Sequence, residues 1–209
     1  MEKDVKEILF SEEVLREKVK QLGENITKDY CDKKLVLVGV LKGASVFLSD
    51  LIRHIKIPVK IDFIAVSSYG LTTESSGVVK IIKDLDDGIE DKHVLIVEDI
   101  IDTGLTLHYL CENLLSRKPK SLKICTLLDK PERRKIEILV DYKGFDIPDE
   151  FVVGYGIDYA ESYRNLPYVG VLKREIYEWF LIRIKDYRNS NTNMERKMIL
   201  LGEDNEFNE

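Results

Sequence analysis

Three carboxylates and a turn of small residues follow one apolar run in the middle of the chain. Residues 94–97 are aliphatic and suit a central strand. Glu98, Asp99 and Asp102 come next, within the segment that leads to the turn 103–106 and a helical pattern. Amides at a helix start are unpaired and carry the positive end of the helix dipole. This order of residues therefore predicts a phosphosugar site.

An ordinary helix cap is the simpler interpretation of the Thr-Gly-x-Thr turn, with Thr103 or Thr106 accepting from free amides. The neighbouring acids argue against it, because such a cluster is costly unless hydroxyls, a metal or a proton compensates it. Gly104 allows close approach of the backbone to a ligand. The chain has neither the Gly-x-Gly-x-x-Gly dinucleotide motif after a strand nor a Walker-type phosphate loop.

Strand and helix patterns alternate from residue 35 to residue 128, which predicts a mainly parallel sheet covered on both faces, with ligands at the carboxyl ends of its strands. The expected strands are 35–40, 60–66, 78–83, 94–97, 122–128, 136–140, 151–153 and 168–171. The expected helices are 11–22, ending before Gly23, then 44–55, 106–115 and 175–187.

Two segments are predicted to lie outside this framework. The polar loop 67–77 is either a plain hairpin loop or a closing lid, and its length favours a lid. Ile176, Trp179, Phe180 and Ile184 form a helical stripe that indicates core packing or a subunit contact. We expect one domain over residues 1–188 and a flexible polar tail over 189–209.

Composition limits the classes of function. The net charge of −6 argues against a general nucleic-acid binder, and the only dense basic cluster, at residues 130–135, is compatible with a solvated loop. No apolar run is long enough for a membrane span, and no signal sequence is evident. Three cysteines without paired spacing indicate reduced thiols and a cytoplasmic protein. The histidines are isolated, so any metal should be held by oxygen atoms.

The segment Val97-Glu-Asp-Ile-Ile-Asp-Thr-Gly-Leu-Thr106 resembles the phosphoribosyl pyrophosphate motif of the type I phosphoribosyltransferases. Five further segments resemble the hypoxanthine-guanine branch of that family: 41–44, 66–70, 127–131, 151–159 and 163–172. The resemblance implies an α/β fold of the type I phosphoribosyltransferase kind, with a mainly parallel central sheet flanked by helices and a small hood formed by the terminal segments.

The resemblance also implies a reaction, the transfer of a 5-phosphoribosyl group from its pyrophosphate to N9 of a 6-oxopurine. In that reading Glu98 and Asp99 hold the ribose hydroxyls and Asp102 takes the purine N7 proton. Lys130 donates to the 6-oxo group and disfavours 6-aminopurines. The 5′-phosphate-binding loop is made of Thr103, Gly104, Leu105 and Thr106, and Leu105 contributes only its amide.

The remaining implied roles concern pyrophosphate, metal and base. Lys42, Gly43 and Arg164 would bind pyrophosphate, with Ser68 and Tyr69 closing over it. Mg²⁺ is the implied cofactor, held by Glu98, Asp99 and Asp158. The implied purine-binding residues are Lys130, Phe151, Val152 and Asp158.

Other functions remain open at this level. A regulatory protein could keep this fold, sense phosphoribosyl pyrophosphate and bind nucleic acid, but the acidic composition and the pair Asp102 and Lys130 favour the enzyme. A pyrimidine transferase or a ribose-phosphate pyrophosphokinase is opposed by Lys130 and Phe151. The partners expected are small-molecule substrates, with neither nucleic acid nor membrane, and a homodimer or homotetramer is implied by the resemblance. The preference between hypoxanthine and guanine, and the acceptance of xanthine, stay open.

Overall fold

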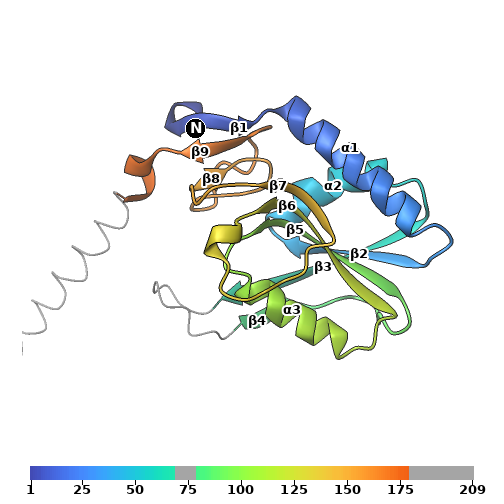
Figure 1. Ribbon diagram of the computed structural model, residues 1–209. Helices are drawn as coiled ribbons and strands as arrows, with labels where there is room; N and C mark the ends of the chain where they lie inside the picture. The colour runs from blue at the N-terminus through green and yellow to red at the C-terminus, as the bar shows by residue number, and fades with distance from the viewer. Residues whose placement is uncertain (69–78, 179–209) are drawn as a thin grey trace, which may run out of the picture. The chain divides into compact units, whose positions relative to one another are not determined.

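A six-stranded sheet in the order β4-β3-β2-β5-β6-β7 organises the chain (Figure 1). The computed structural model describes residues 1–68 and 79–178. The strands of this sheet are β2 Leu35–Leu41, β3 Val59–Ser68, β4 Val79–Lys83, β5 His93–Ile101, β6 Ser121–Asp129 and β7 Tyr142–Asp146. All neighbouring pairs are parallel except β3 and β4. The predicted mainly parallel sheet is confirmed.

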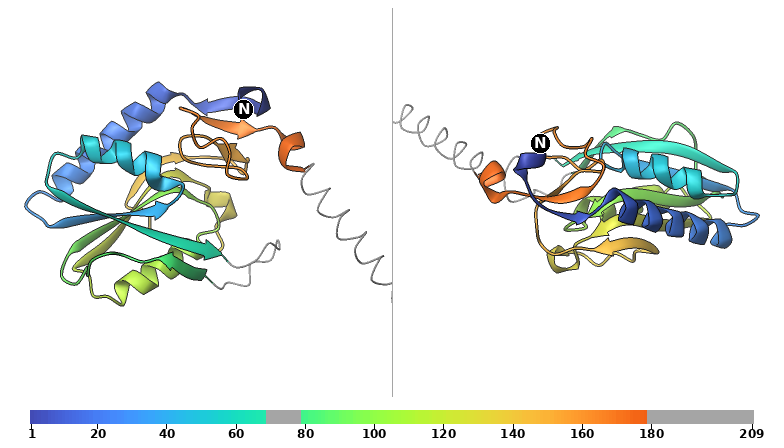
Figure 2. Two further views of the ribbon diagram at one scale, coloured as in Figure 1. Left: turned by 180° about the vertical axis from the view of Figure 1, so that it is seen from behind. Right: turned by 90° about the horizontal axis from the view of Figure 1, so that it is seen from above.

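Helices cover both faces of this sheet, as Figures 1 and 2 show. Helices α1 Glu12–Asp29 and α2 Ala44–His54 lie on one face, and α3 Leu105–Leu115 lies on the other. Val94 to Val97 of β5 have no exposed surface, since they pack into the apolar clusters on the two faces. A strand buried on both sides is aliphatic throughout, which is why this run could be recognised.

The first helix is longer than predicted. It begins at the expected cap, where the Ser11 hydroxyl accepts from Val14 N at 3.4 Å, but it continues through Gly23 to Asp29. A Cβ on Gly23 would lie only 2.6 Å from Cβ of His54 at the end of α2. Gly23 therefore serves the close packing of two helices and does not terminate one.

The strand predicted at residues 136–140 is wrong, because residues 142–146 form β7 instead. β7 takes the edge position beside β6, with Tyr142 opposite Cys125. Ile136 and Ile138 pack beside the turn at Gly104, within 3.3 Å of where its Cβ would lie. The apolar alternation that suggested a strand thus covers the phosphate turn.

A second sheet has the order β1-β9-β8. Its strands are β1 Val5–Phe10, β8 Val152–Val153 and β9 Val169–Leu172. They come from both ends of the chain, in agreement with the hood expected from the terminal segments. Val152, Val169 and Val171 are buried in the same apolar cluster as α1 and α2.

The chain divides into two units, one of Met1–Lys6 with Leu172–Glu209 and the other of Glu7–Val171. Residues 174–178 are helical, but most of the helix predicted at 175–187, with Trp179, Phe180 and Ile184, lies outside the described residues. The boundary at residue 188 and the flexible tail also lie outside them and stay predictions. No helix among residues 1–68 and 79–178 is long and apolar enough to cross a membrane.

Candidate active site

The turn after β5 has the geometry of an anion site at a helix start. Gly104 adopts a left-handed conformation, φ 84°, directly before the first residue of α3. Gly104 occupies the N-cap position and has no side chain that could cap the helix. Thr103 Oγ1 accepts a hydrogen bond from Leu105 N at 3.5 Å. Apart from the amide of Leu105, the amides of the first helical turn thus remain available for a phosphate group.

Glu98 and Asp99 belong to β5 itself, since the strand extends to Ile101. Asp99 Oδ1 accepts from Ile100 N at 2.9 Å, whereas the buried Oε2 of Glu98 has no hydrogen-bond partner among the described residues. Burial, and then the charge of Asp99, raises the pKa of Glu98 well above its usual range. Burial also raises the pKa of Asp99 to about 6. This pair of acids needs a cation or hydroxyl donors.

The loop after β2 meets the same acids. The peptide between Leu41 and Lys42 is cis, and Gly43 precedes α2. A methyl group on Gly43 would overlap the carboxylate of Asp99, so only glycine fits. The ends of the neighbouring strands β2 and β5 thus converge on one point.

Arg164 lies in a loop that packs against Gly43. Its Nη1 donates to Gly156 O at 2.9 Å, and Nη2 lies 2.8 Å from Asp158 Oδ1. Gly156 has a left-handed φ of 100°, and a Cβ there would overlap the carbonyl oxygen of Gly43. Nε of Arg164 is buried and without a partner in the described part of the chain. One buried N–H of this guanidinium is therefore unused.

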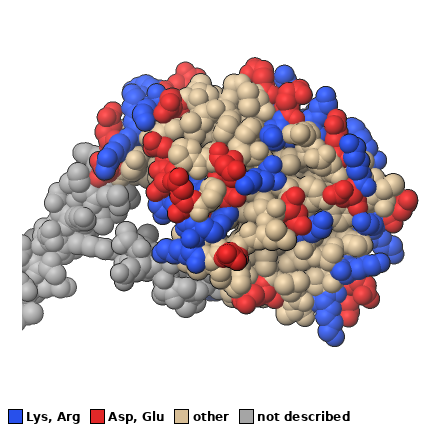
Figure 3. Space-filling view, viewed as in Figure 1, with Lys and Arg blue, Asp and Glu red and all other residues tan. Residues whose placement is uncertain are grey.

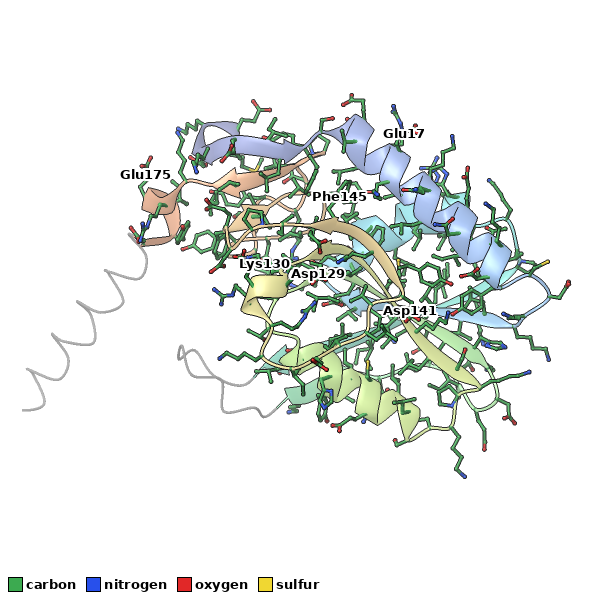
Figure 4. The ribbon with its side chains drawn as sticks, in the orientation of Figure 1. Glu17, Asp129, Lys130, Asp141, Phe145 and Glu175 are labelled. Carbon is green, nitrogen blue, oxygen red and sulfur yellow. The ribbon has the colours of Figure 1, made fainter. Side chains whose placement is uncertain are left out.

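Lys130 follows β6 and is 8% exposed (Figure 4). Its backbone N–H donates to Ile101 O at 3.0 Å, which joins the end of β6 to the phosphate turn. Burial lowers the pKa of Lys130, and the charge of Asp102 opposes that effect. A buried lysine with an acid nearby is suited to donate a hydrogen bond to a polar ligand, which is the role that the sequence predicts for Lys130.

The carboxylate of Asp102 forms an ion pair with Arg133, which is not among the site residues predicted from the sequence. Oδ1 of Asp102 lies 2.7 Å from Nε of Arg133, which also reaches Asp149 Oδ1 at 3.3 Å. The negative charge of Asp102 raises the pKa of the Arg133 guanidinium above its usual range. The sequence signals this residue only through its place in the basic cluster at 130–135, a cluster that is also compatible with a solvated loop.

A family model for the phosphoribosyl transferase domain matches residues 5–160. The chain belongs to this family. The hypoxanthine-guanine phosphoribosyltransferase of Bacillus subtilis is 57% identical over 178 residues, covering 85% of this chain and 99% of that protein. Its counterpart in Streptococcus thermophilus is 56% identical over 177 residues, covering 85% of this chain and 98% of that protein.

Solved structures agree with these relatives. A hypoxanthine phosphoribosyltransferase from Staphylococcus aureus matches with a TM-score of 0.83 and 58% identity, over 85% of this chain and 96% of that one. A hypoxanthine-guanine phosphoribosyltransferase from Bacillus anthracis, with HEPES in its active site, matches with a TM-score of 0.78 and 57% identity, over 81% and 99%. The phosphoribosyltransferase fold inferred from the sequence is confirmed.

Phe151 and Val152, which the sequence predicts to bind the purine, lie at the start of β8 in this phosphoribosyltransferase. The ring of Phe151 meets that of Tyr159 edge-on, with centroids 5.4 Å apart, and Phe151 remains 37% exposed. The ring of Phe151 is thus partly accessible beside Tyr159. Val152 is buried and pairs with Val171 in the second sheet.

The structure brings some of the predicted site residues together, whereas it does not describe the side chains of others. Gly43, Asp99, Asp158 and Arg164 lie in one cluster, through the contacts given above. Ser68 ends β3, but its side chain is not described, and Tyr69 lies outside the described residues. Among the described residues, no three acids, cysteines or histidines form a complete metal site.

Charges of both signs alternate over the described surface seen in Figure 3, where red and blue clusters adjoin. This face carries no broad basic region of the kind that binds nucleic acid.

Proposed function

We propose that the chain transfers the 5-phosphoribosyl group of 5-phosphoribosyl 1-pyrophosphate to N9 of hypoxanthine or guanine, releasing pyrophosphate and the nucleoside 5′-monophosphate. The observation that carries this proposal is the buried Lys130, whose backbone N–H donates to Ile101 O at the end of β5, just before the phosphate turn. This hydrogen bond connects the lysine that would bind the purine to the turn that would bind the phosphate. The names of the bacterial relatives support the same reaction.

On the purine, Asp102 would accept the N7 proton while Lys130 donates to the 6-oxo group. A 6-amino group would place donor against donor, so adenine should be rejected through an unmet hydrogen bond. Phe151, which is 37% exposed, would stack on the purine, and backbone groups at Val152 would read the purine edge.

On the sugar, Glu98 and Asp99 would accept hydrogen bonds from the ribose hydroxyls. The unpaired Oε2 of Glu98 is available for such a donor. The amides of Thr103 to Thr106 would bind the 5′-phosphate, with the hydroxyls of the two threonines beside them.

The pyrophosphate site would combine Lys42, Gly43 and Arg164. The unused buried Nε of Arg164 supports binding of an anion there. Mg²⁺ fits the acceptor set, because Glu98, Asp99 and Asp158 offer carboxylate oxygens and this ion is commonly shared between one or two carboxylates and substrate phosphates. When bound, Mg²⁺ neutralises charge on the leaving pyrophosphate. Ser68 and Tyr69 would close over the reacting atoms and exclude water.

The test is to mix the protein with phosphoribosyl pyrophosphate, Mg²⁺ and each of hypoxanthine, guanine, xanthine and adenine, and to follow nucleotide formation. Turnover with hypoxanthine or guanine, and none with adenine, is expected. No turnover with either 6-oxopurine would refute the proposal. Binding of phosphoribosyl pyrophosphate without any turnover would instead support the regulatory alternative, which the enzyme names of the relatives disfavour.

We further expect the enzyme to act in the cytoplasm as a homodimer or homotetramer, with one domain over residues 1–188. The three cysteines are unpaired, which suits a reducing compartment. Sedimentation of the purified protein would distinguish the two assemblies from a monomer.

A further inference from the structure

Arg134 connects the phosphate turn to the end of β6. It directly follows the short helix Pro131–Arg133, and its side chain is 15% exposed. Nη1 donates to the carbonyl oxygen of Asp102 at 3.0 Å, and Nη2 is paired with the carboxylate of Asp129. One planar guanidinium thus spans the ends of two neighbouring strands.

The bond to Asp102 O determines the orientation of an amide in the phosphate turn. A peptide unit is planar and trans, so fixing the carbonyl of Asp102 also fixes the direction of the Thr103 N–H on the opposite side. The carbonyl of Thr103 is held in turn by Lys135 N at 2.9 Å. The Arg134 stem packs at Gly104, with Cδ 3.2 Å from where a Cβ would lie. Arg134 and its neighbour therefore hold the loop that is to receive the phosphate.

The ion pair between Arg134 and Asp129 connects the same guanidinium to the end of β6. Asp129 is the last residue of β6, immediately before Lys130, and its side chain is 7% exposed (Figure 4). A buried carboxylate needs a cation, and its second oxygen lies 3.7 Å from Lys143 Nζ. Because the backbone of Lys130 is bonded to Ile101, the position of β6 relative to the turn also sets the position of this lysine.

We propose that Arg134 is a positioning residue that holds the phosphate turn and the purine lysine in register, so that the two substrates, phosphoribosyl pyrophosphate and the purine, are bound next to each other. The inference rests on the roles proposed above for Lys130 and the turn. It differs from the pairing of Arg133 with the carboxylate of Asp102, because Arg134 donates to the main-chain carbonyl oxygen of Asp102. Lysine could not replace it, since a single ammonium lacks the planar fork that reaches both partners.

The test compares Arg134→Lys with a matched control, Arg117→Lys. Arg117 also forms a forked pair, with Asp84 at 2.7 and 3.0 Å, on α3's carboxyl-terminal side and away from the turn. Arg134→Lys should keep a charge partner for Asp129 and should fold. We expect the KM for phosphoribosyl pyrophosphate and the KM for hypoxanthine both to rise about tenfold or more. Arg117→Lys should change neither KM by more than about twofold, whatever its effect on the melting temperature.

Arg134→Met provides a second measurement, because it removes both bonds and should also lower the melting temperature. A folded Arg134→Lys protein with both KM values within about twofold of the parent would overturn the proposal. So would an equal loss in Arg117→Lys, which would assign the effect to general stability. A parent protein that turns over no purine would refute the proposed function instead. The affinity of Arg134→Lys for phosphoribosyl pyrophosphate, measured by calorimetry, would then still decide the role of Arg134 at the turn.

Discussion

Gly43 and Asp99 lie so close together that any side chain on the glycine would overlap the carboxylate. The two residues come from the ends of different strands, β2 and β5, which are hydrogen-bonded neighbours in the sheet. In the proposed mechanism one faces pyrophosphate and the other faces the ribose. Their contact therefore sets the spacing between the two halves of one substrate.

Gly43→Ala should weaken binding of phosphoribosyl pyrophosphate by about 10²-fold, because the added methyl group must displace Asp99 or the loop at Lys42. Isothermal titration calorimetry measures the effect. Gly88→Ala is the matched control, since a Cβ at Gly88 would meet nothing within 4 Å. Equal affinity in the two variants would show that the loop shifts freely.

Glu98→Gln should stabilise the substrate-free protein at pH 8. Burial raises the pKa of Glu98, and it raises the pKa of Asp99 from 3.8 to about 6. A raised pKa in the folded state means that folding favours the protonated acid. As the pH rises from about 4 through 6, the shift of Asp99 therefore costs the parent stability on the order of 3 kcal/mol, and the loss is complete above the raised pKa values.

Urea denaturation with a chelator present, at pH 5 and pH 8, tests this sign. The free energy of unfolding of Glu98→Gln should exceed that of the parent at pH 8, and this difference in free energy should be smaller at pH 5. Glu112→Gln is the control, because that side chain is 68% exposed and should change stability by less than about 0.5 kcal/mol. A parent more stable than Glu98→Gln at pH 8 would contradict the prediction.

The phosphate turn and the central strands could be predicted from the sequence because their signals are local. Residues 94–97 are aliphatic in one run, and Gly104 lies where a helix must begin. Nothing in the sequence near Gly23 could reveal that it packs against His54, thirty-one positions along the chain by their numbering. A glycine that ends a helix and a glycine that admits a second helix look alike in sequence.

The basic cluster after Lys130 shows the same limit for the site. Four cations within six positions suggest a solvated loop, and the structure turns two of them toward acids on other elements. Arg133 reaches Asp102 and Arg134 reaches Asp129, contacts that depend on how β5 and β6 are paired. Asp102 can be recognised in the sequence from its position after an apolar run, whereas its pairing with Arg133 depends on the tertiary structure.

Lys130→Gln should reduce kcat/KM for hypoxanthine by roughly 10- to 150-fold, the equivalent of a lost charged hydrogen bond of about 1.5 to 3 kcal/mol. The glutamine carbonyl can accept from a 6-amino group, so the ratio of adenine to hypoxanthine turnover should rise. Lys123→Gln, on the same strand β6 and 41% exposed, should leave both rates near those of the parent. An unchanged ratio would remove Lys130 from reading the purine 6-position.

Asp102→Asn should lower kcat about 10²-fold or more while the affinity for phosphoribosyl pyrophosphate stays close to that of the parent, as expected for a general base. Single-turnover kinetics and calorimetry separate the two quantities. Asp149→Asn controls for the ion-pair network, because it removes the other partner of Arg133 but keeps the carboxylate of Asp102. A near-normal kcat in Asp102→Asn would exclude the proposed base.

Arg133→Gln tests whether the ion pair at Asp102 must open before the purine binds. Both side chains are 44% exposed, and exposed pairs contribute up to about 1 kcal/mol, so the competition between Arg133 and the purine is limited to about fivefold. The KM for hypoxanthine should therefore fall, by up to about fivefold, at saturating phosphoribosyl pyrophosphate. A rise in that KM would mean that Arg133 contacts the purine or its product and assists binding, since a residue that only competes for Asp102 cannot weaken the complex when it is removed.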